Sequence, residues 1–158
     1  RVLFRSSMMI REATMADYGR LGELYAQLIP ADLLFGTADS KHVFEEILPG
    51  KHLHLFVLED EHGDIQASSY LNVIPNMSRG ASPYAFIENV ITDELARGQG
   101  VGKRLLKHVV EFAWNQGCYK VALLTGCDDT HEFYTACGFD DDRKFAFEIR
   151  NPQIVTKS

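Results

Sequence analysis

The chain has 158 residues, a formal net charge of −6 and a hydrophobic fraction of 46%, which predict one globular domain with a substantial core. The acidic balance and the lack of a basic stripe argue against nucleic-acid binding, and no apolar run approaches the ~20 residues that span a bilayer, so no membrane partner is expected. We expect a single domain over residues 9–151. Residues 1–8 lack the features of a signal peptide and are expected to be an expression remnant or a disordered leader.

The first half of the chain predicts four strands and two helices. Thr14 is a good N-cap for the first helix, with Asp17 in its first turn, and Pro30 ends that helix. In chain order the expected elements are a strand over 9–12, a helix up to residue 28, a helix from Asp39 or Ser40 to residue 48, and strands over 53–58, 65–74 and 84–91.

The second half predicts two helices and two strands. A long helix runs from Gln99 to about Gln116, and the continuous apolar pattern of residues 119–124 indicates a strand buried on both faces. A short helix over 130–137 follows, with Gly138 as its C-cap, and residues 143–149 alternate as a half-exposed closing strand should. The order β-α-α-β-β-β-α-β-α-β predicts an α/β fold with helices on both faces of a central mixed sheet.

The run Arg97-Gly98-Gln99-Gly100-Val101-Gly102 lies between an apolar strand and an amphipathic helix. The first N–H groups of a helix lack internal partners, and the helix dipole is positive at that end. A glycine-rich turn at such a position is a cradle for an anion, most often phosphate. The run therefore predicts a site for a phosphorylated cofactor.

Two common phosphate motifs do not fit this run. A Walker-type P-loop needs a glycine where Arg97 stands and a Ser or Thr where Arg104 stands. A dinucleotide fingerprint needs a third glycine where Lys103 or Leu105 stands. The remaining pattern is R-x-x-G-x-G.

This pattern and its surroundings resemble the GNAT superfamily of acetyl-CoA-dependent N-acetyltransferases. The resemblance covers residues 84–139 clearly and residues 9–83 more loosely. It includes the strand over 87–92, the helix over 99–116, the turn into the next strand over 117–121, and the FYxxxGF signature at 133–139. Three motifs in the right order and spacing make this a specific match, whereas the glycine motif alone would be weak.

The resemblance implies that acetyl-CoA is the cosubstrate. Its diphosphate would be held by Arg97, Gly98, Gln99, Gly100, Val101, Gly102 and Lys103. Val90, Ile91 and Thr92 would offer backbone N–H groups freed where two parallel strands separate, with Ile91 as the oxyanion donor. Thr130, Phe133 and Tyr134 would supply the remaining contacts. Many relatives carry an asparagine just before the FY helix, and its absence here leaves the Thr130 contact open.

The resemblance also implies two catalytic residues. Glu88 would accept the proton of the amine, which is mostly charged at neutral pH. Tyr134 would protonate the leaving thiolate. The alternatives are that Glu88 pairs with an arginine and orders the sheet, and that Tyr134 is an ordinary packed aromatic. Direct attack by the amine in a ternary complex is preferred to a covalent step through Cys127 or Cys137.

Other polar residues have plainer interpretations. His131 is expected to be a solvated helix residue rather than a second acid or base. His52 and His54 share a strand face without a third ligand, and Cys118, Cys127 and Cys137 lack metal-ligand spacing. We therefore expect no metal, reduced thiols and a cytoplasmic location.

The acceptor is expected to be a small-molecule primary amine. Its pocket would be built by the first two helices, the loop over 75–83 and the end of the chain. Parts of the sequence also resemble glucosamine-6-phosphate N-acetyltransferases, in which case Arg79 would bind the phosphate. A third alternative, from another class, is a non-catalytic acyl-CoA-binding or sensing domain. A homodimer is common in the family and is expected here.

Overall fold

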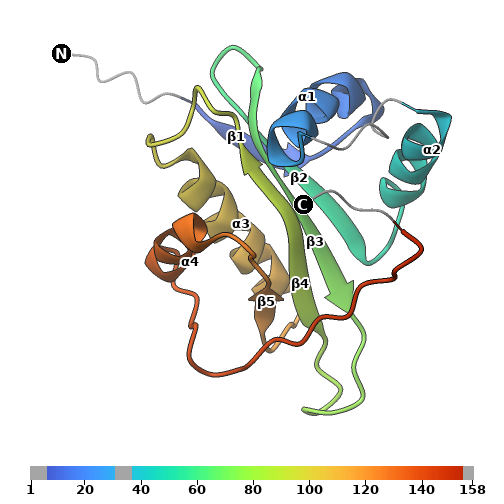
Figure 1. Cartoon of the computed structure of the whole chain (residues 1–158), viewed down its shortest axis with the longest axis vertical. Coiled ribbons are helices and arrows are strands. Elements are labelled where there is room, and N and C mark those ends of the chain that lie inside the picture. The colour runs from blue at the N-terminus through green and yellow to red at the C-terminus, as the bar shows by residue number, and fades with distance from the viewer. Residues whose placement is uncertain (1–6, 31–36, 155–158) are drawn as a thin grey trace.

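The computed structural model describes residues 7–30 and 37–154, which form a five-stranded sheet with helices on both faces (Figure 1). The strand order is β1-β2-β3-β4-β5; the first four are antiparallel and β5 is parallel to β4. The helices and strands are β1 (Met9–Glu12), α1 (Tyr18–Leu28), α2 (Ala38–Ile47), β2 (Leu53–Glu59), β3 (Ile65–Ile74), β4 (Tyr84–Thr92), α3 (Val101–Asn115), β5 (Val121–Leu123) and α4 (His131–Ala136), with short 3-10 turns at Met15–Asp17 and Asp128–Thr130. No helix in these two ranges is both long and apolar enough to cross a membrane.

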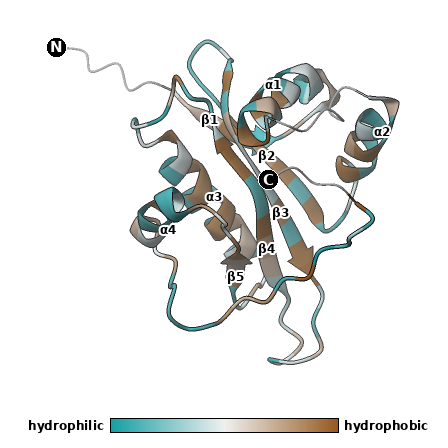
Figure 2. Ribbon diagram, in the orientation of Figure 1, coloured by the Kyte–Doolittle hydropathy of each residue, from teal (hydrophilic) through white to brown (hydrophobic). Residues whose placement is uncertain are grey.

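The sheet separates two apolar clusters because successive side chains of a strand point to opposite faces. Brown stripes on the strands and on the inner sides of the helices mark these clusters in Figure 2. One cluster lies under α3 and α4 and combines Val101, Leu105 and Val109 of α3 with Phe56, Leu58, Leu71 and Ile87 of the sheet. The other lies under α1 and α2 and combines Leu21, Leu24 and Phe44 with Leu55, Val57, Ile65 and Ile91. Strand β2 contributes to both clusters, so it is buried on both faces.

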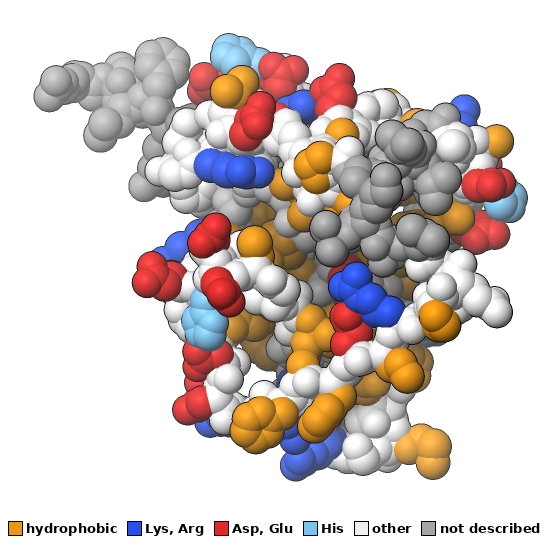
Figure 3. Space-filling model, in the orientation of Figure 1, with side chains coloured by type: hydrophobic (Ala, Val, Ile, Leu, Met, Phe, Trp, Pro, Cys, Tyr) orange, Lys and Arg blue, Asp and Glu red, His pale blue; other side chains and the backbone are white. Residues whose placement is uncertain are grey.

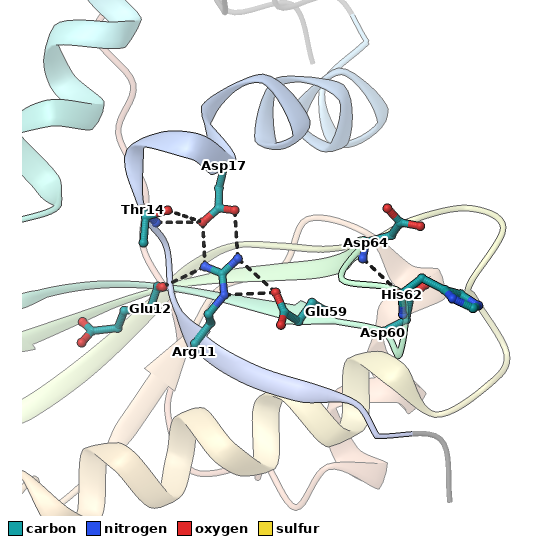
Figure 4. Close-up of polar contacts among 8 residues, drawn as sticks. All are labelled: Arg11, Glu12, Thr14, Asp17, Glu59, Asp60, His62 and Asp64. Atoms are coloured by element: carbon teal, nitrogen blue, oxygen red, sulfur yellow. Dashed lines mark hydrogen bonds and ion pairs between the residues drawn. The ribbon is translucent and has the colours of Figure 1, made fainter. Parts of the chain in front are cut away.

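Charged side chains fasten the start of α1 to the edge of the sheet (Figure 4). Arg11 donates two hydrogen bonds to Asp17, at 2.7 and 3.0 Å, and its Nε donates to Glu59 at 3.1 Å. The backbone N–H of Thr14 also donates to Asp17, at 2.8 Å. The hydrogen bonds from Arg11 lower the pKa of the Asp17 carboxyl. The predicted cap at Thr14 and Asp17 is therefore part of a larger ion-pair network.

The predicted elements between residues 9 and 116 are confirmed. Their boundaries differ by no more than two residues, except that the helix predicted to follow Thr14 begins as the 3-10 turn Met15–Asp17 and is α-helical only from Tyr18. The second helix begins one residue before the predicted Asp39, because Thr37 is its N-cap and accepts a hydrogen bond from the Ser40 N–H at 3.2 Å. The short helix before Gly138 is confirmed as α4, and Gly138 adopts the positive φ, 93°, of a C-terminal glycine. The prediction of an α/β fold with helices on both faces is confirmed.

Two predictions about the C-terminal part are wrong. The strand over 119–124 was expected to be buried on both faces, but β5 covers three residues and Tyr119 and Leu124 are exposed. Residues 143–149 were expected to close the sheet, but they form no strand and are exposed. Both errors have one physical cause. A strand needs a paired edge, and in the described residues the outer edge of β5 has no strand partner.

Candidate active site

Strand β4 contains a bulge next to the predicted base. Ser68 of β3 faces Ile91 and Tyr70 faces Glu88, so Ser69 opposes two residues of β4, Asn89 and Val90. Asn89 has a φ of 53°, which is uncommon for a non-glycine residue. The Tyr25 side chain of α1 forms a hydrogen bond with Asn89. The bulge re-aims the backbone of β4 at residues 89–90.

Strands β4 and β5 separate just before this bulge. They pair in parallel only from Ala85–Val121 to Ile87–Leu123. Beyond that point β4 continues to Thr92, whereas β5 ends. On the β5 side, no described strand therefore pairs with Val90, Ile91 and Thr92. Backbone groups at such a separation are available to a ligand that adds alongside β4.

The glycine turn after β4 has the conformation that an anion cradle needs. Gly98 and Gly100 both have φ of 77°, and a Cβ at either position would meet no atom within 4 Å. Gly100 is the N-cap of α3, so the free N–H groups of a fifteen-residue helix start there. Lys103 and Arg104 follow on the first turn of the helix, and both are exposed. The turn thus combines backbone donors, the helix dipole and cations.

Side chains hold this turn against the rest of the molecule. Arg97 donates from Nε to the Thr92 carbonyl at 3.2 Å, which spans the turn. Asp93 accepts hydrogen bonds from Arg20 at 2.8 Å and from Gln27 at 3.2 Å, both on α1. The backbone N–H of Leu95 and these side chains lower the pKa of Asp93. The segment that leads into the turn is therefore fastened to α1.

Tyr134 lies on α4 close to the start of α3. Its ring packs edge-on against Phe133 at 5.1 Å and Phe139 at 6.1 Å between centroids. Phe133 in turn lies against Gly102, where a Cβ would be 3.1 Å from the Phe133 Cζ. Burial, and then the nearby Cys137 and Glu88, raise the pKa of the Tyr134 hydroxyl. Tyr134 is thus a protonated phenol at neutral pH and lies within electrostatic reach of Glu88.

Glu88 is an exposed side chain on the face of β4 that α1 and α2 cover. It is the cross-strand partner of Tyr70, which packs against the cluster under α1 and α2. None of the ion pairs found within residues 7–30 and 37–154 includes Glu88. The interpretation that Glu88 orders the sheet through an arginine therefore has no support in the described residues. Its carboxylate is available to an incoming amine.

The structure brings most of the predicted site residues to one place, where β4 leaves β5. Val90, Ile91 and Thr92 form the open strand, and residues 97–103 form the turn at its end and the first residues of α3. Phe133 lies against Gly102, and Tyr134 packs on Phe133. Thr130 is different, because its hydroxyl donates to the Cys127 carbonyl at 2.8 Å and contacts the Thr125 hydroxyl at 2.6 Å. It occupies the N-cap position of α4 without a side-chain capping bond. The Thr130 hydroxyl therefore forms its hydrogen bonds with the loop that precedes α4.

The remaining polar candidates have local partners. His131 pairs with Asp141, as expected for a solvated helix residue. His54 contacts Glu12 at 2.7 Å. Arg79 lies over the ring of Tyr119, 5.6 Å from its centroid, near the start of β5. Across the described ranges, no group of three or more His, Cys, Asp or Glu side chains is placed to hold a metal ion.

Three contributors to the site were missed by the sequence reasoning. The sequence pattern predicts Tyr25 and Tyr70 only as parts of a helix and a strand, yet they flank Asn89 and Glu88. Burial raises the pKa of the Tyr25 hydroxyl to about 12. Gln27 binds both Asp93 and the backbone N–H of Glu94. The polar Gln27 within the apolar pattern of α1 was the only local signal for that contact.

Comparisons with known proteins agree with this geometry. Residues 21–139 match the family described as the Acetyltransferase (GNAT) family. Glucosamine 6-phosphate N-acetyltransferase 1 of rice, Oryza sativa subsp. japonica, is 34% identical over 82% of this chain and 79% of its own.

Two solved structures extend the likeness to the whole fold. A putative acetyltransferase from Agrobacterium tumefaciens str. C58 has a TM-score of 0.84 at 41% identity, covering 90% of this chain and 99% of its own. Aminoglycoside N-acetyltransferase AAC(6')-Iy, solved in complex with CoA, has a TM-score of 0.76 at 25% identity, covering 95% and 99%.

Proposed function

Because the chain belongs to the GNAT acetyltransferase family and is an acetyl-CoA-dependent N-acetyltransferase, we propose that its acceptor is the primary amine of an amino sugar. The observation that carries this proposal is Glu88, which forms no ion pair with any described residue and lies beside the bulge, within electrostatic reach of Tyr134. A carboxylate attracts a small ammonium ion and accepts its proton. Two relatives whose names give their substrates act on glucosamine 6-phosphate and on aminoglycosides, and both substrates are amino sugars.

The proposed cosubstrate site is the glycine turn and the open part of β4. The free N–H groups at the start of α3 and the guanidinium of Arg97 would hold the diphosphate of CoA. Acetyl-CoA supplies an activated acetyl thioester when it is bound. The open backbone of Val90 and Ile91 would hydrogen-bond the acetyl oxygen and stabilise the negative charge that develops on it.

The two proposed catalytic side chains move protons in opposite directions. Glu88 takes a proton from the acceptor ammonium, which leaves a neutral amine able to attack. Tyr134 gives its proton to the departing thiolate, and its raised pKa keeps that proton in place through neutral pH. The amine attacks directly in a ternary complex. No covalent enzyme step is needed, because the neutral amine can attack the thioester carbonyl directly. Burial also raises the pKa of the Cys137 thiol, which makes that thiol a weaker nucleophile.

A panel of amines tests the acceptor class. Thiol release from acetyl-CoA is measured with glucosamine 6-phosphate, glucosamine, an aminoglycoside and a lysine peptide. We expect turnover with at least one amino sugar at a kcat/KM well above that of the peptide. A peptide preferred over every sugar would overturn the proposal. Tight CoA binding without turnover of any amine would favour the alternative of a sensing domain.

Within the class of amino sugars, glucosamine 6-phosphate is the individual substrate that we consider. The match to the rice enzyme, which covers most of both chains, favours it. It predicts a preference for the phosphorylated over the unphosphorylated sugar. Arg79→Ala should then raise the KM of the phosphorylated sugar alone. Equal KM changes for both sugars would remove Arg79 from the phosphate site.

The Glu88→Gln variant tests the base. We expect a loss of about 10²- to 10⁴-fold in kcat near neutral pH, as is typical of general bases, and an upward shift of the pH optimum, because more of the free amine is then needed. Glu111→Gln removes the same charge from an exposed site on α3 and serves as the control. An unshifted pH profile in Glu88→Gln would assign the base elsewhere.

Two further points belong to this proposal. We place the enzyme in the cytoplasm on the ground of its unpaired cysteines, and fractionation of expressing cells tests that location. We also propose that the protein is a homodimer. A measurement of its mass in solution tests this oligomeric state.

A further inference from the structure

Asn89 has an unusual backbone conformation for a residue inside a strand. Among the described residues, the non-glycine residues with a positive φ are Arg79, Ala81 and Asn89, and Asn89 alone of these three lies in a strand. A residue with a Cβ pays a steric cost in this left-handed region, although asparagine tolerates it better than most. Contacts around Asn89 are needed to offset that cost, because a strand residue otherwise prefers the extended conformation.

The strands beside the bulge do not supply such a contact through their side chains. Ser69 of β3 opposes Asn89 and Val90, but its hydroxyl is buried and has no hydrogen-bond partner among the described residues. On the other side of β4, no pairing with β5 in the described chain continues past Ile87. The conformation of Asn89 therefore depends on contacts from outside the sheet.

Helix α1 supplies the contact. The Tyr25 side chain forms a hydrogen bond with the Asn89 side chain. One turn earlier on the same face of the helix, Leu24 belongs to the apolar cluster that includes Ile91. Asp93 accepts hydrogen bonds from two further side chains of α1. The helix thus holds β4 at alternate residues, 89, 91 and 93, which bracket the open part of the strand.

The Tyr25 hydroxyl is suited to holding the backbone rather than to reacting. Its pKa of about 12 keeps it a neutral phenol through neutral pH, and its ring packs against the apolar cluster under α1 and α2. Figure 3 shows that the molecule is hollowed between α1 and α4, where β4 crosses the view in Figure 1. A ligand in this hollow would meet β4, while Tyr25 holds the bulge from the side of α1.

We propose that Tyr25 is a positioning residue for acetyl transfer. Its hydrogen bond keeps Asn89 in the left-handed conformation, and that conformation turns the backbone N–H groups of Val90 and Ile91 toward the acetyl oxygen. Tyr25 itself exchanges no proton. This role rests on the proposed function in one respect, the binding of the acetyl oxygen by the open backbone of β4, and it does not depend on which amine is the acceptor.

Tyr25→Phe tests the hydrogen bond, and Tyr18→Phe is its matched control. Both changes remove a tyrosine hydroxyl from α1, but that of Tyr18 bonds the Ser40 hydroxyl of α2 at 2.6 Å. In thiol release with the best amino sugar of the panel, Tyr25→Phe should lower kcat by about 10²-fold, the scale of a 1 Å misplacement of reacting groups. Its KM for acetyl-CoA and its pH optimum should stay unchanged, and Tyr18→Phe should keep the wild-type kcat.

Three results of these assays would overturn the proposal. A wild-type kcat in Tyr25→Phe would show that the hydrogen bond positions nothing. Equal losses of kcat in Tyr25→Phe and Tyr18→Phe would show a general loosening of α1. A shifted pH optimum in Tyr25→Phe would make the hydroxyl a proton carrier.

Substitutions of Asn89 separate backbone conformation from side-chain chemistry. Glycine adopts a positive φ without steric cost, whereas alanine does not. Asn89→Ala should therefore lose more kcat than Asn89→Gly. In the Asn89→Gly background, Tyr25→Phe should lower kcat little further, because the hydrogen bond is already absent. Equal losses in the two Asn89 variants, or a full additional loss from Tyr25→Phe, would refute the role of Tyr25.

Nuclear magnetic resonance of the free protein tests the bulge without an acceptor. The three-bond coupling between the amide and α protons of Asn89 depends on its φ. This coupling should change in Tyr25→Phe and keep its wild-type value in Tyr18→Phe. An unchanged coupling in Tyr25→Phe would overturn the proposal, whereas failure of every amine in the thiol assay would overturn only the proposed acceptor class. Calorimetry with CoA checks that each variant remains folded, because the glycine turn is untouched.

Discussion

Gly102 lies at the second position of α3, where the helix faces Thr92 at the end of β4 and Phe133 of α4. A Cβ at this position would be 2.8 Å from the Thr92 Oγ1 and 3.1 Å from the Phe133 Cζ, against 3.4–4 Å for ordinary contact. The Gly102→Ala variant must therefore push the start of α3 off β4 or displace the Phe133 ring. Overpacking of this kind costs about 1–3 kcal/mol, and we expect the free energy of unfolding to fall by that amount.

Urea denaturation measures this loss, and Gly19→Ala is its matched control. Gly19 is also the second residue of its helix, α1, but a Cβ there would meet no atom within 4 Å. Alanine at Gly19 should stabilise the protein by about 0.4–1 kcal/mol, because it restricts the unfolded chain without a clash. Both substitutions replace glycine with alanine, but they should change the free energy of unfolding in opposite directions.

A second substitution tests whether the clash causes the expected loss of stability in Gly102→Ala. Thr92→Ala removes the nearer of the two clashing atoms, so the double variant Gly102→Ala/Thr92→Ala should lose less stability than the sum of the single changes. Because the clash displaces the N–H groups that open α3, Gly102→Ala should also weaken CoA binding in calorimetry. Wild-type stability together with wild-type CoA affinity in Gly102→Ala would refute the close approach and the cradle that depends on it.

The other predictions concern backbone strain, acid catalysis and an ion pair. Gly100 has a left-handed φ in open space, so Gly100→Ala should cost about 1–2 kcal/mol in urea denaturation, and Gly100→Asn less, because Asn tolerates that conformation; equal losses would contradict the strain argument. Tyr134→Phe should lower kcat by roughly 10²- to 10⁴-fold with little change in the KM for acetyl-CoA, and undiminished turnover in the thiol assay would remove Tyr134 from the acid role. The folded-state pKa of Asp17 is depressed, so its stabilisation is present above the unfolded pKa of ~3.9 and is lost as pH falls through the folded value. Asp17→Asn should therefore lose about 1.5–3 kcal/mol at pH 7 and show a shallower acid limb below pH ~4; acid limbs of equal slope would disprove the linkage.

Local patterns accounted for most of the helices and strands. The spacing of Val101, Leu105 and Val109 predicted α3, and the same side chains are buried under the sheet. The glycine turn could be predicted from the sequence because its conformation depends on the glycines themselves. Other residues seldom adopt their positive φ. These features involve residues close together in the chain, so the order of residues carries the information directly.

Strand pairing between residues far apart in the chain could not be predicted in the same way. The alternation of residues 143–149 predicted a strand, but a strand forms only beside a partner strand, and residues 143–149 pair with no described strand. The continuous apolar run of 119–124 indicated burial on both faces, but β5 is the edge strand of the described sheet and Tyr119 and Leu124 are exposed. The missing information in both cases concerned what lies beside the segment.

By itself, the sequence determined the family, the place of the proposed anion cradle and the two side chains proposed to move protons. The tertiary structure alone decided how they meet: the bulge at Asn89, the separation of β4 from β5, and the fastening of Asp93 to Arg20 and Gln27. Each of these depends on groups that lie far apart in the chain and become neighbours only when the sheet and its helices pack. Short-range conformational preference cannot specify such neighbours, because their energy arises only from contacts made in the folded molecule.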